Sequence, residues 1–344
     1  MLRPTRIAIV GAGIAGLACA DALKAAGHEV SLFDKGRGPG GRMSTRRMET
    51  PLGEAAFDHG AQYFAARDPD FRAEVAGWQA GGIATPWPEA GAEAWVGVPG
   101  MNAVVCRMAA NHMVELGLLV TGLVRKNGAW WLASQRGEIG PFDAALLAIP
   151  AEQAAAILSL HDFSMGRTAL TARSQPCWTG MFAFSEALEH MPPVIRHAGN
   201  IEWAARNSSK PGRSGPEAWV VQMNAVWSTR WLESPPEDIC AMLLAALAEA
   251  AGQALPAPVM ATAHRWRFAL SAGMGDGALW NGQLRLGACG DWLLGPRVEC
   301  AWLSGRMLAE RAIDIEAQTL ANPNLQIPDC PKGQVQSFRS AFKR

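Results

Sequence analysis

The sequence has almost no tyrosine, few lysines and no net charge. Of its 344 residues only Tyr63 is a tyrosine, beside 14 tryptophans and 11 phenylalanines, and only 6 are lysine. A mechanism that needs two tyrosines is therefore excluded. Lysine plus arginine equals aspartate plus glutamate at 31 each, so no overall positive field attracts a nucleic acid or an anionic membrane. We expect neither partner.

The cysteines form no cross-linking or metal-binding pattern. Seven cysteines occur without a CxxC pair or a nearby histidine cluster, which favours neither a disulfide framework nor a metal site and fits the reducing cytoplasm. The most apolar window, residues 144–160, is broken by Pro150 and Glu152 before it reaches the roughly 18 residues of a membrane span. A signal peptide that ends near Ala20 is an alternative interpretation of the N-terminus. It is the weaker one, because cleavage there would remove the glycine motif described next.

A glycine-rich turn near the N-terminus joins a predicted strand to a predicted helix. The β-branched run 6–10 ends at Gly11, and apolar residues then repeat at helical spacing. A second strand, 29–33, ends at Asp34. In a dinucleotide-binding unit the glycines admit a pyrophosphate at the helix N-terminus, and the acid accepts hydrogen bonds from ribose hydroxyls. The pattern predicts a dinucleotide site, with a purely structural turn as the alternative, and its members are Gly11, Gly13, Ile14, Ala15, Gly16 and Asp34.

The segment after this acid is rich in glycine and arginine. Residues 36–41 repeat the GxGxxG pattern, but 42–47 carry no helical stripe, so we expect a loop rather than a second dinucleotide unit. Arg42 can pair with the pyrophosphate as a bidentate donor.

These motifs resemble those of the flavin-containing amine oxidase superfamily. Its members carry a GGR segment (here 40–42), a segment that passes the flavin ring (57–64), a PGM-type turn (99–101) and a Gly-Asp pair (290–291) ahead of a helix. The resemblance implies bound FAD. It adds to the predicted cofactor-binding residues Lys35, Gly41, Arg42, Met43, His59, Gly60, Ala61, Gln62, Val120, Gly290, Asp291, Arg297, Val298, Glu299 and Ala301.

Within this superfamily the chain resembles the bacterial renalases along nearly its whole length. The blocks of resemblance are 11–17, 32–44, 60–68, 205–211, 263–266 and 289–305. The resemblance implies an oxidase that takes hydride from 2- or 6-dihydro-NAD(P), isomers with hydride at the wrong ring carbon. The products would be NAD(P)+ and, from molecular oxygen, hydrogen peroxide.

The two nucleotide-type motifs stand near opposite ends of the chain, so the middle is expected to be an insertion. We predict an α/β protein in which both chain ends build an FAD-binding Rossmann-like domain and the insertion builds a mostly antiparallel substrate domain. The predicted ranges are 1–75, 96–150 and 280–316 for the FAD-binding domain, 76–95 and 151–279 for the substrate domain, and 317–344 for a C-terminal extension. A hydrophobic fraction of 49% supports a large core.

Several elements of the middle region are predicted from periodicity and turn residues. They are a hairpin of strands 118–124 and 129–133, a strand 146–150, a helix 151–160, strands 180–185, 217–223 and 259–266, and a helix 236–251. Residues 208–216, rich in glycine, proline and serine, are expected to form an exposed loop.

The implied chemistry requires no general base. A dihydropyridine becomes aromatic when it loses hydride, so the protein mainly has to hold the donor against the flavin. The predicted substrate-binding residues are Tyr63, His264, Arg206, Asn207, Trp292 and Trp302. The alternative for the histidine is a structurally satisfied ring, for the aromatic residues core packing, and for residues 206–207 a solvated loop face.

An amine or amino-acid oxidase is the main alternative. For such an enzyme, the superfamily resemblance implies an aromatic cage and a water molecule held by a lysine near the flavin. Tryptophan could replace a missing tyrosine in the cage, and Lys210 is the only lysine between residues 151 and 279. A nicotinamide-dependent dehydrogenase and a non-catalytic flavin-binding module are further alternatives.

Overall fold

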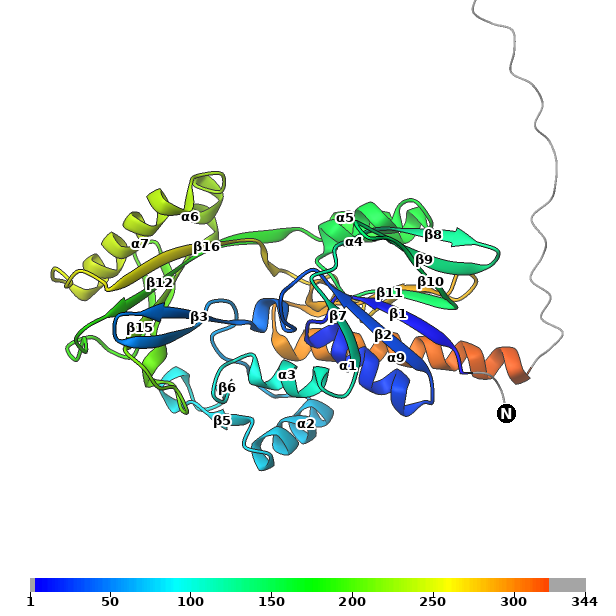
Figure 1. Cartoon of the computed structure of the whole chain (residues 1–344), viewed down its shortest axis with the longest axis horizontal. Helices are drawn as coiled ribbons and strands as arrows, with labels where there is room; N and C mark the ends of the chain where they lie inside the picture. The colour runs from blue at the N-terminus through cyan, green and yellow to red at the C-terminus, as the bar shows by residue number, and fades with distance from the viewer. Residues whose placement is uncertain (1–3, 322–344) are drawn as a thin grey trace, which may run out of the picture.

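The molecule has two lobes that lie end to end. A computed structural model describes residues 4–321. One lobe contains a parallel sheet and the other an antiparallel sheet, and the long strands β12 (Ser174–Phe184) and β16 (Met260–Ser271) run between them (Figure 1). Within the described range no helix is both long enough and apolar enough to span a membrane.

The parallel lobe is built on a six-stranded sheet. Its strands lie in the order β17 (Leu279–Asn281), β18 (Leu286–Ala288), β11 (Ala144–Leu147), β1 (Arg6–Val10), β2 (Glu29–Asp34) and β7 (Met113–Leu116). All neighbours are parallel except β17 and β18. Strands from both ends of the chain are thus neighbours in one sheet, which confirms the predicted α/β architecture.

Both faces of this sheet are covered, which explains why its strands are apolar without alternation. In β1, Ile7 and Ile9 point into one core cluster, whereas Ala8 and Val10 point into another on the opposite face. The second face is covered by α4 (Ala151–Leu158) and α5 (Phe163–Thr171), and by a three-stranded antiparallel sheet of β8 (Val120–Lys126), β9 (Ala129–Ser134) and β10 (Gly137–Phe142). The predicted hairpin is confirmed as β8 and β9.

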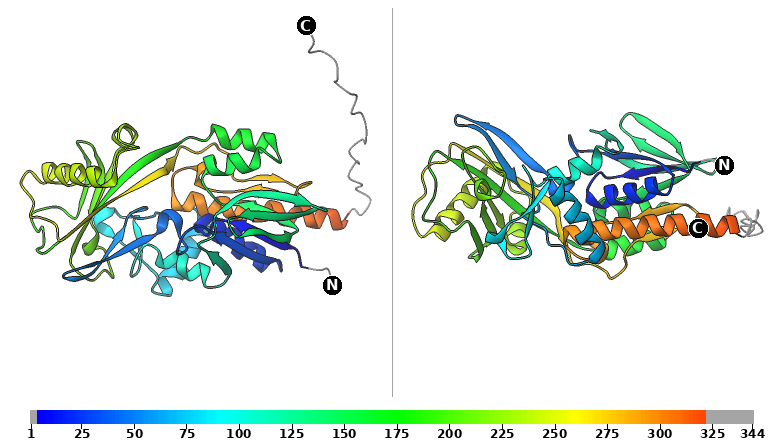
Figure 2. Two further views of the ribbon diagram at one scale, coloured as in Figure 1. Left: turned by 45° about the horizontal axis from the view of Figure 1, so that its top comes forward. Right: turned by 90° about the horizontal axis from the view of Figure 1, so that it is seen from below.

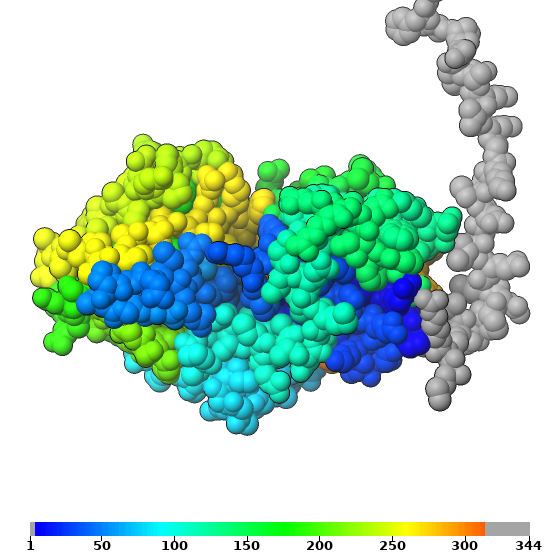
Figure 3. Space-filling model, viewed as in Figure 1, coloured from blue at the N-terminus to red at the C-terminus, as the bar shows by residue number. Residues whose placement is uncertain are grey.

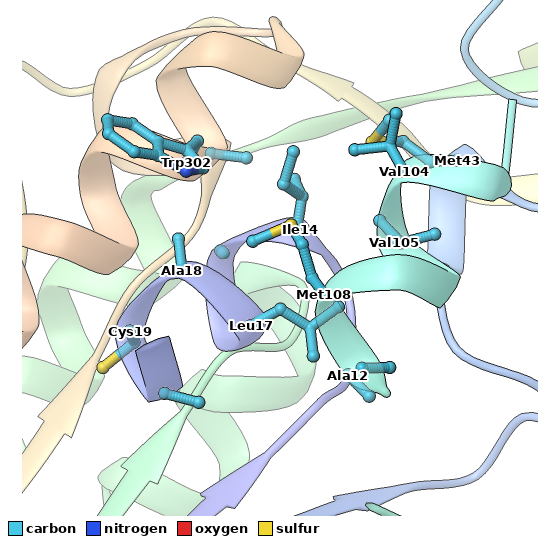
Figure 4. Close-up of a cluster of buried hydrophobic side chains, with 14 of the residues drawn as sticks. Ala12, Ile14, Leu17, Ala18, Cys19, Met43, Val104, Val105, Met108 and Trp302 are labelled. Atoms are coloured by element: carbon cyan, nitrogen blue, oxygen red, sulfur yellow. The ribbon is translucent and has the colours of Figure 1, made fainter. Parts of the chain in front are cut away.

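The first face is covered by helices that are far apart in the sequence. They are α1 (Ile14–Ala25), α3 (Ala103–Ala109) and α9 (Val298–Ala321), and α9 runs alongside α1 through the lobe (Figure 2). Leu17 of α1, Met108 of α3 and Trp302 of α9 belong to the same buried cluster (Figure 4). The apolar repeat that follows Gly11 is therefore the face that α1 buries.

The antiparallel lobe has a five-stranded sheet in the order β13 (Val194–Ala198), β14 (Ile201–Arg206), β15 (Glu217–Met223), β12 and β16. In β12, Trp178 and Phe182 join a core beneath α7 (Pro236–Ala251), whereas Met181 and Ala183 pack on the opposite face against β4 (Gly53–Asp58). The predicted helix 236–251 is confirmed without a change of boundary. The remaining elements are β3 (Thr45–Thr50), β5 (Ala84–Pro86), β6 (Trp95–Gly97), α2 (Pro69–Ala80), α6 (Ala225–Arg230) and α8 (Asp291–Leu294).

Two details differ from the sequence-based expectations. Thr45 to Arg47, expected as a loop, begin strand β3, because pairing with β4 supplies the backbone partners that the local sequence does not signal. The strand expected at 259–266 extends to Ser271 as β16, because β12 supplies pairing partners along almost its whole length.

The predicted domain boundaries stay a prediction. The boundary between residues 75 and 76 falls inside α2, and Val75 and Trp78 both join the cluster that contains α1. Helix α9 continues to Ala321, past the predicted start of the extension at residue 317. The rest of that extension lies outside the described residues.

Candidate functional site

The glycine turn lies between β1 and α1, at the carboxyl end of the parallel strands. Gly11 has φ +108°, and a Cβ there would lie 2.3 Å from the carbonyl oxygen of Ala148. A Cβ on Gly16 would lie 2.0 Å from the carbonyl oxygen of Gly11, whereas one on Gly13 would meet nothing within 4 Å. Two glycines therefore permit close packing of the chain, and the third borders open space. No side chain caps the N-terminus of α1, where Ile14 and Ala15 begin the helix, so its N–H groups are suited to an anion.

Asp34 ties the end of β2 to this turn. One carboxylate oxygen accepts a hydrogen bond from the N–H of Ala12 and the other from the N–H of Gly36, each at 2.7 Å. An ionised carboxylate can accept about four hydrogen bonds, so two sites remain for ribose hydroxyls. Lys35 is exposed, with its ammonium 3.5 Å from the amide oxygen of Gln153.

Arg42 is the point at which four distant segments meet. Its guanidinium donates two hydrogen bonds to the carboxylate of Asp291, at 2.6 and 2.7 Å, and one to the carbonyl oxygen of Ala269 at 3.1 Å. Its own carbonyl oxygen accepts a hydrogen bond from the N–H of Ala61 at 2.8 Å. A Cβ on Gly60 would lie 2.1 Å from that oxygen, so only glycine permits this approach. The structure thus brings together residues predicted to bind the cofactor from three separate motifs.

Other predicted cofactor residues already have partners within the protein. The N–H of Gly290 donates to the hydroxyl of Ser304 at 2.9 Å. Glu299 accepts the N–H groups of Arg67 and Asp68 at 2.5 and 2.7 Å, which fixes the start of α2. Arg297 contacts the sulfur of Cys300 at 3.3 Å. Met43, Val120 and Ala301 are buried, Gly41 is exposed, and Val298 begins α9.

Two histidines lie together beside Arg46 of β3. The rings of His59 and His264 are 5.0 Å apart, edge to face, and Trp266 lies within 5.1 Å of both. A guanidinium nitrogen of Arg46 is 3.4 Å from Nδ1 of His264. Because a guanidinium only donates, Nδ1 is the acceptor and the proton of His264 resides on Nε2.

Both histidines are neutral at pH 7. Burial, reinforced by His264 and Arg46, lowers the pKa of His59 to about 3. Burial and the charge of Arg46 lower the pKa of His264 to about 4. Nδ1 of His59 is buried without a hydrogen-bond partner among the residues that the structure describes. Buried polar atoms without a partner are rare in folded proteins, so the surroundings of this ring leave one of its nitrogens unsatisfied.

A buried charge cluster, which the sequence did not predict, lies next to this pair. Lys210 and Arg213 both contact Asp58, with nitrogen to oxygen distances of 3.2 and 2.6 Å, and all three side chains are at most 1% exposed. Lys210 also donates to the side-chain oxygen of Gln62 at 3.2 Å and lies over the ring of Trp87. The expectation that 208–216 is an exposed loop is therefore wrong for its two cations, because the buried carboxylate draws them inward.

Burial and the neighbouring charges shift the pKa values of Asp58 and Lys210 in this cluster. Burial would raise the pKa of Asp58, but Lys210 and Arg213 outweigh it and hold the pKa well below its usual range. Burial lowers the pKa of Lys210 to about 8, opposed by Asp58 and assisted by Arg213. At pH 7 the cluster therefore contains one negative and two positive charges.

The other predicted substrate residues are not all gathered at the histidine pair. Tyr63 is 37% exposed, and its ring lies 5.3 Å from that of Trp203. Trp292 and Trp302 are buried in the two cores of the parallel lobe. Trp292 donates to the carbonyl oxygen of Ile149, and the ring of Trp302 packs at a tilt against that of Phe71.

Residues 206 and 207 form no solvated loop face. Arg206 is ion-paired with Glu217 at 3.1 Å. Asn207 is fully buried and donates to the carbonyl oxygen of Ala56 at 2.7 Å. Both side chains therefore hold parts of the protein together.

Comparison with known proteins agrees with the geometry of the parallel lobe. Residues 9–76 match the family model of an NAD(P)-binding Rossmann-like domain. A stretch of 46 residues is 48% identical to an L-amino-acid oxidase of Pseudechis australis, but it covers only 13% of this chain and 9% of that protein. The sequence comparison therefore identifies a dinucleotide-binding unit.

Solved structures extend the similarity to the whole fold. A provisionally assigned protoporphyrinogen oxidase from Exiguobacterium sp. 255-15 superposes with a TM-score of 0.72 at 11% identity, covering 92% of this chain and 100% of that chain. Cyclohexylamine oxidase from Brevibacterium oxydans IH-35A gives 0.67 at 13% identity, with the same coverage. A putrescine oxidase variant gives 0.63 at 13% identity, again with 92% and 100% covered. This chain shares their two-lobed fold.

Proposed function

We propose that this protein is an FAD-dependent oxidase of dihydronicotinamide dinucleotides. Its substrates would be 2- or 6-dihydro-NAD(P), its products NAD(P)+ and hydrogen peroxide. In this proposal the parallel lobe binds FAD and the antiparallel lobe contributes the substrate side. Bound FAD would supply the ring that accepts hydride and then reduces oxygen.

The residues present fit a bound dinucleotide. Gly13 borders open space beside the uncapped N-terminus of α1, where backbone N–H groups can bind phosphate oxygens. Asp34 retains acceptor sites for a ribose. Arg42 and Asp291 lie beside each other. Arg42 can pair with the pyrophosphate of FAD, and Asp291 can accept hydrogen bonds from the hydroxyls of its ribityl chain.

The neutral histidine pair is the observation on which the substrate class rests. A dihydronicotinamide gives up hydride without losing a proton in the same step, so its site needs positioning groups rather than a general base, and histidines with such low pKa values are weak bases. His59 and His264 are uncharged at neutral pH. His264 is only partly buried and can hydrogen-bond a carboxamide from its position beside Trp266, whereas the buried ring of His59, which the resemblance assigns to the cofactor, packs edge to face against it.

An amine or amino-acid oxidase is the second candidate, favoured by the amine oxidases among the structures that share the fold. Lys210 argues against it. Asp58 and Gln62 accept two of its three hydrogen bonds, and the ring of Trp87 lies 5.0 Å from the ammonium, so the lysine already has partners within the protein. The side chain is also wholly inaccessible to solvent.

An anaerobic titration distinguishes these candidates. The purified protein, loaded with FAD, is mixed with an equilibrated mixture of dihydro-NAD isomers, and the visible absorbance of the flavin is followed. We expect bleaching by this mixture and none by pure 1,4-dihydro-NAD, cyclohexylamine, putrescine or L-amino acids. Admission of oxygen should restore the absorbance and release hydrogen peroxide. Bleaching by an amine alone would select the second candidate, and no bleaching by any donor would select a non-catalytic flavin protein.

A further inference from the structure

Strand β3 and the loop before it bear more positive charge than their surroundings neutralise. The cations between residues 35 and 47 are Lys35, Arg37, Arg42, Arg46 and Arg47. Arg42 is paired with Asp291 and Arg47 with Glu54. Among residues 4–313, whose side chains the structure describes, no carboxylate forms an ion pair with Arg37 or Arg46. The chain as a whole has no net charge, so two unpaired guanidinium groups in one segment make a local excess of positive charge.

Arg46 is the more constrained of the two. Arg46 is half-buried, and its guanidinium contacts the ring of His264. This ring is neutral and cannot compensate the charge of the guanidinium. Burial and the neighbouring charge of Arg37 lower its pKa, but a guanidinium remains protonated in proteins. An uncompensated positive charge in a partly dry setting is costly, and a bound anion would remove that cost. The strand that contains Arg46 lies along β16, which contains His264, on one face of the molecule (Figure 3).

We propose that Arg46 and Arg37 form an anion subsite for the pyrophosphate of a dinucleotide substrate, next to the histidine pair. The choice of a dinucleotide rests on the proposed function. One ribose separates a nicotinamide from its pyrophosphate, so the groups that bind the two must be neighbours, as Arg46 and His264 are. Guanidinium groups bind phosphate oxygens bidentately. The same two charges repel a cationic amine, so the subsite also selects against amines.

The binding experiment uses ADP-ribose, which contains the pyrophosphate but no nicotinamide. Calorimetric titration of the FAD-loaded protein should give an affinity that Arg46→Gln weakens by about tenfold or more, the loss of roughly one charge-assisted contact. Arg47→Gln is the matched control, because Arg47 is the next residue of the same strand, is exposed, and is paired with Glu54. It should alter the affinity by less than about twofold. Arg37→Gln removes the second positive charge of the subsite. Because Arg37 is exposed, this substitution tests that charge without disturbing packing.

Kinetics separates this subsite from the proposed function. With isomeric dihydro-NAD, Arg46→Gln should lower kcat/KM mainly through KM. This loss should exceed the loss on the phosphate-free isomeric dihydronicotinamide riboside by about tenfold, because the riboside feels only the changed contact between residue 46 and His264. Equal loss on both substrates, absence of ADP-ribose binding by the wild type, or loss of FAD from Arg46→Gln would each overturn the subsite. If the wild type oxidises neither substrate but binds ADP-ribose through Arg46, the subsite stands and the proposed function fails.

Discussion

Arg42 and Asp291 are 249 positions apart in the sequence, and they form a two-bond ion pair. The arginine follows the second strand of the N-terminal unit, and the aspartate begins α8 after the last strand of the sheet. The pair therefore joins the two ends of the chain at the carboxyl edge of the parallel sheet.

Breaking this pair should loosen that junction. Arg42→Lys keeps the charge but removes the fork that makes two parallel hydrogen bonds. Because Arg42 is about one-third exposed, we expect a loss of only about 1–2 kcal/mol in the free energy of unfolding, measured in urea. The matched control is Arg67→Lys, whose pair with Glu93 is about 60% exposed on both sides and should contribute less than about 0.5 kcal/mol. Equal losses from the two variants would contradict a structural role for the Arg42 pair.

Substitution by alanine should have different effects at two glycines of the same turn, one on stability and the other on FAD binding. A methyl group on Gly16 meets the backbone of Gly11, so Gly16→Ala should destabilise the protein by about 3 kcal/mol or more. Gly13 has ordinary backbone angles and open space, so Gly13→Ala should leave stability within about 1 kcal/mol of wild type. It should nevertheless weaken FAD binding, read from the flavin retained after dialysis, by about tenfold or more. Full retention of FAD by Gly13→Ala would remove the turn from the cofactor site.

The histidine pair should make stability fall in mild acid. An unfolded histidine has a pKa of about 6.5. Because folding lowers the pKa of His59 to about 3 and that of His264 to about 4, the unfolded chain binds more protons below pH 6.5. The free energy of unfolding should therefore decrease as the pH falls from about 6.5 to 4, by up to about 1.4 kcal/mol per pH unit for each histidine.

Urea unfolding at a series of pH values checks this expectation. His59→Gln should flatten the slope, since it removes one of the two groups. His197→Gln is the control, because His197 is exposed and paired with Glu202. If His59→Gln and wild type have the same slope, His59 does not stay neutral in the folded protein.

The buried charge cluster should be sensitive to which charge is removed. Asp58→Asn leaves Lys210 and Arg213 buried without a counter-charge and should cost about 3–5 kcal/mol of stability. Lys210→Met keeps the pair of Asp58 and Arg213 and removes one buried cation, so its cost should be smaller, about 1–2 kcal/mol. The double variant should recover part of the loss of Asp58→Asn, measured by urea unfolding. A Lys210→Met variant as unstable as Asp58→Asn would show that the lysine, and not the balance of charge, holds the cluster.

Local sequence predicted the N-terminal unit because its signals are local. The strand, the turn, the helix and Asp34 all follow one another within 34 residues, and the structure places them at β1, α1 and the end of β2. The long helix α7 was equally predictable, since its apolar stripe and its proline at the start are contained in its own 16 residues.

The charge cluster was not predictable for the opposite reason. Lys210 stands in a stretch of glycine, proline and serine that is typical of solvated loops. Its burial is decided by Asp58 and Gln62, which are 152 and 148 positions away. The start of β3 was missed likewise, because only its pairing with β4 distinguishes it from a loop. Such features depend on contacts that no periodicity within a segment encodes.

The long ladder between β12 and β16 determines how the lobes can move. It pairs Ser174 with Ser271 at one end and Ala183 with Met260 at the other, with one shift of register. Ser174 is also anchored to Glu152 of α4 in the parallel lobe. A strand pair that runs between two lobes resists bending, because bending would strain many backbone hydrogen bonds at once. The lobes should therefore keep a nearly fixed relative orientation during turnover.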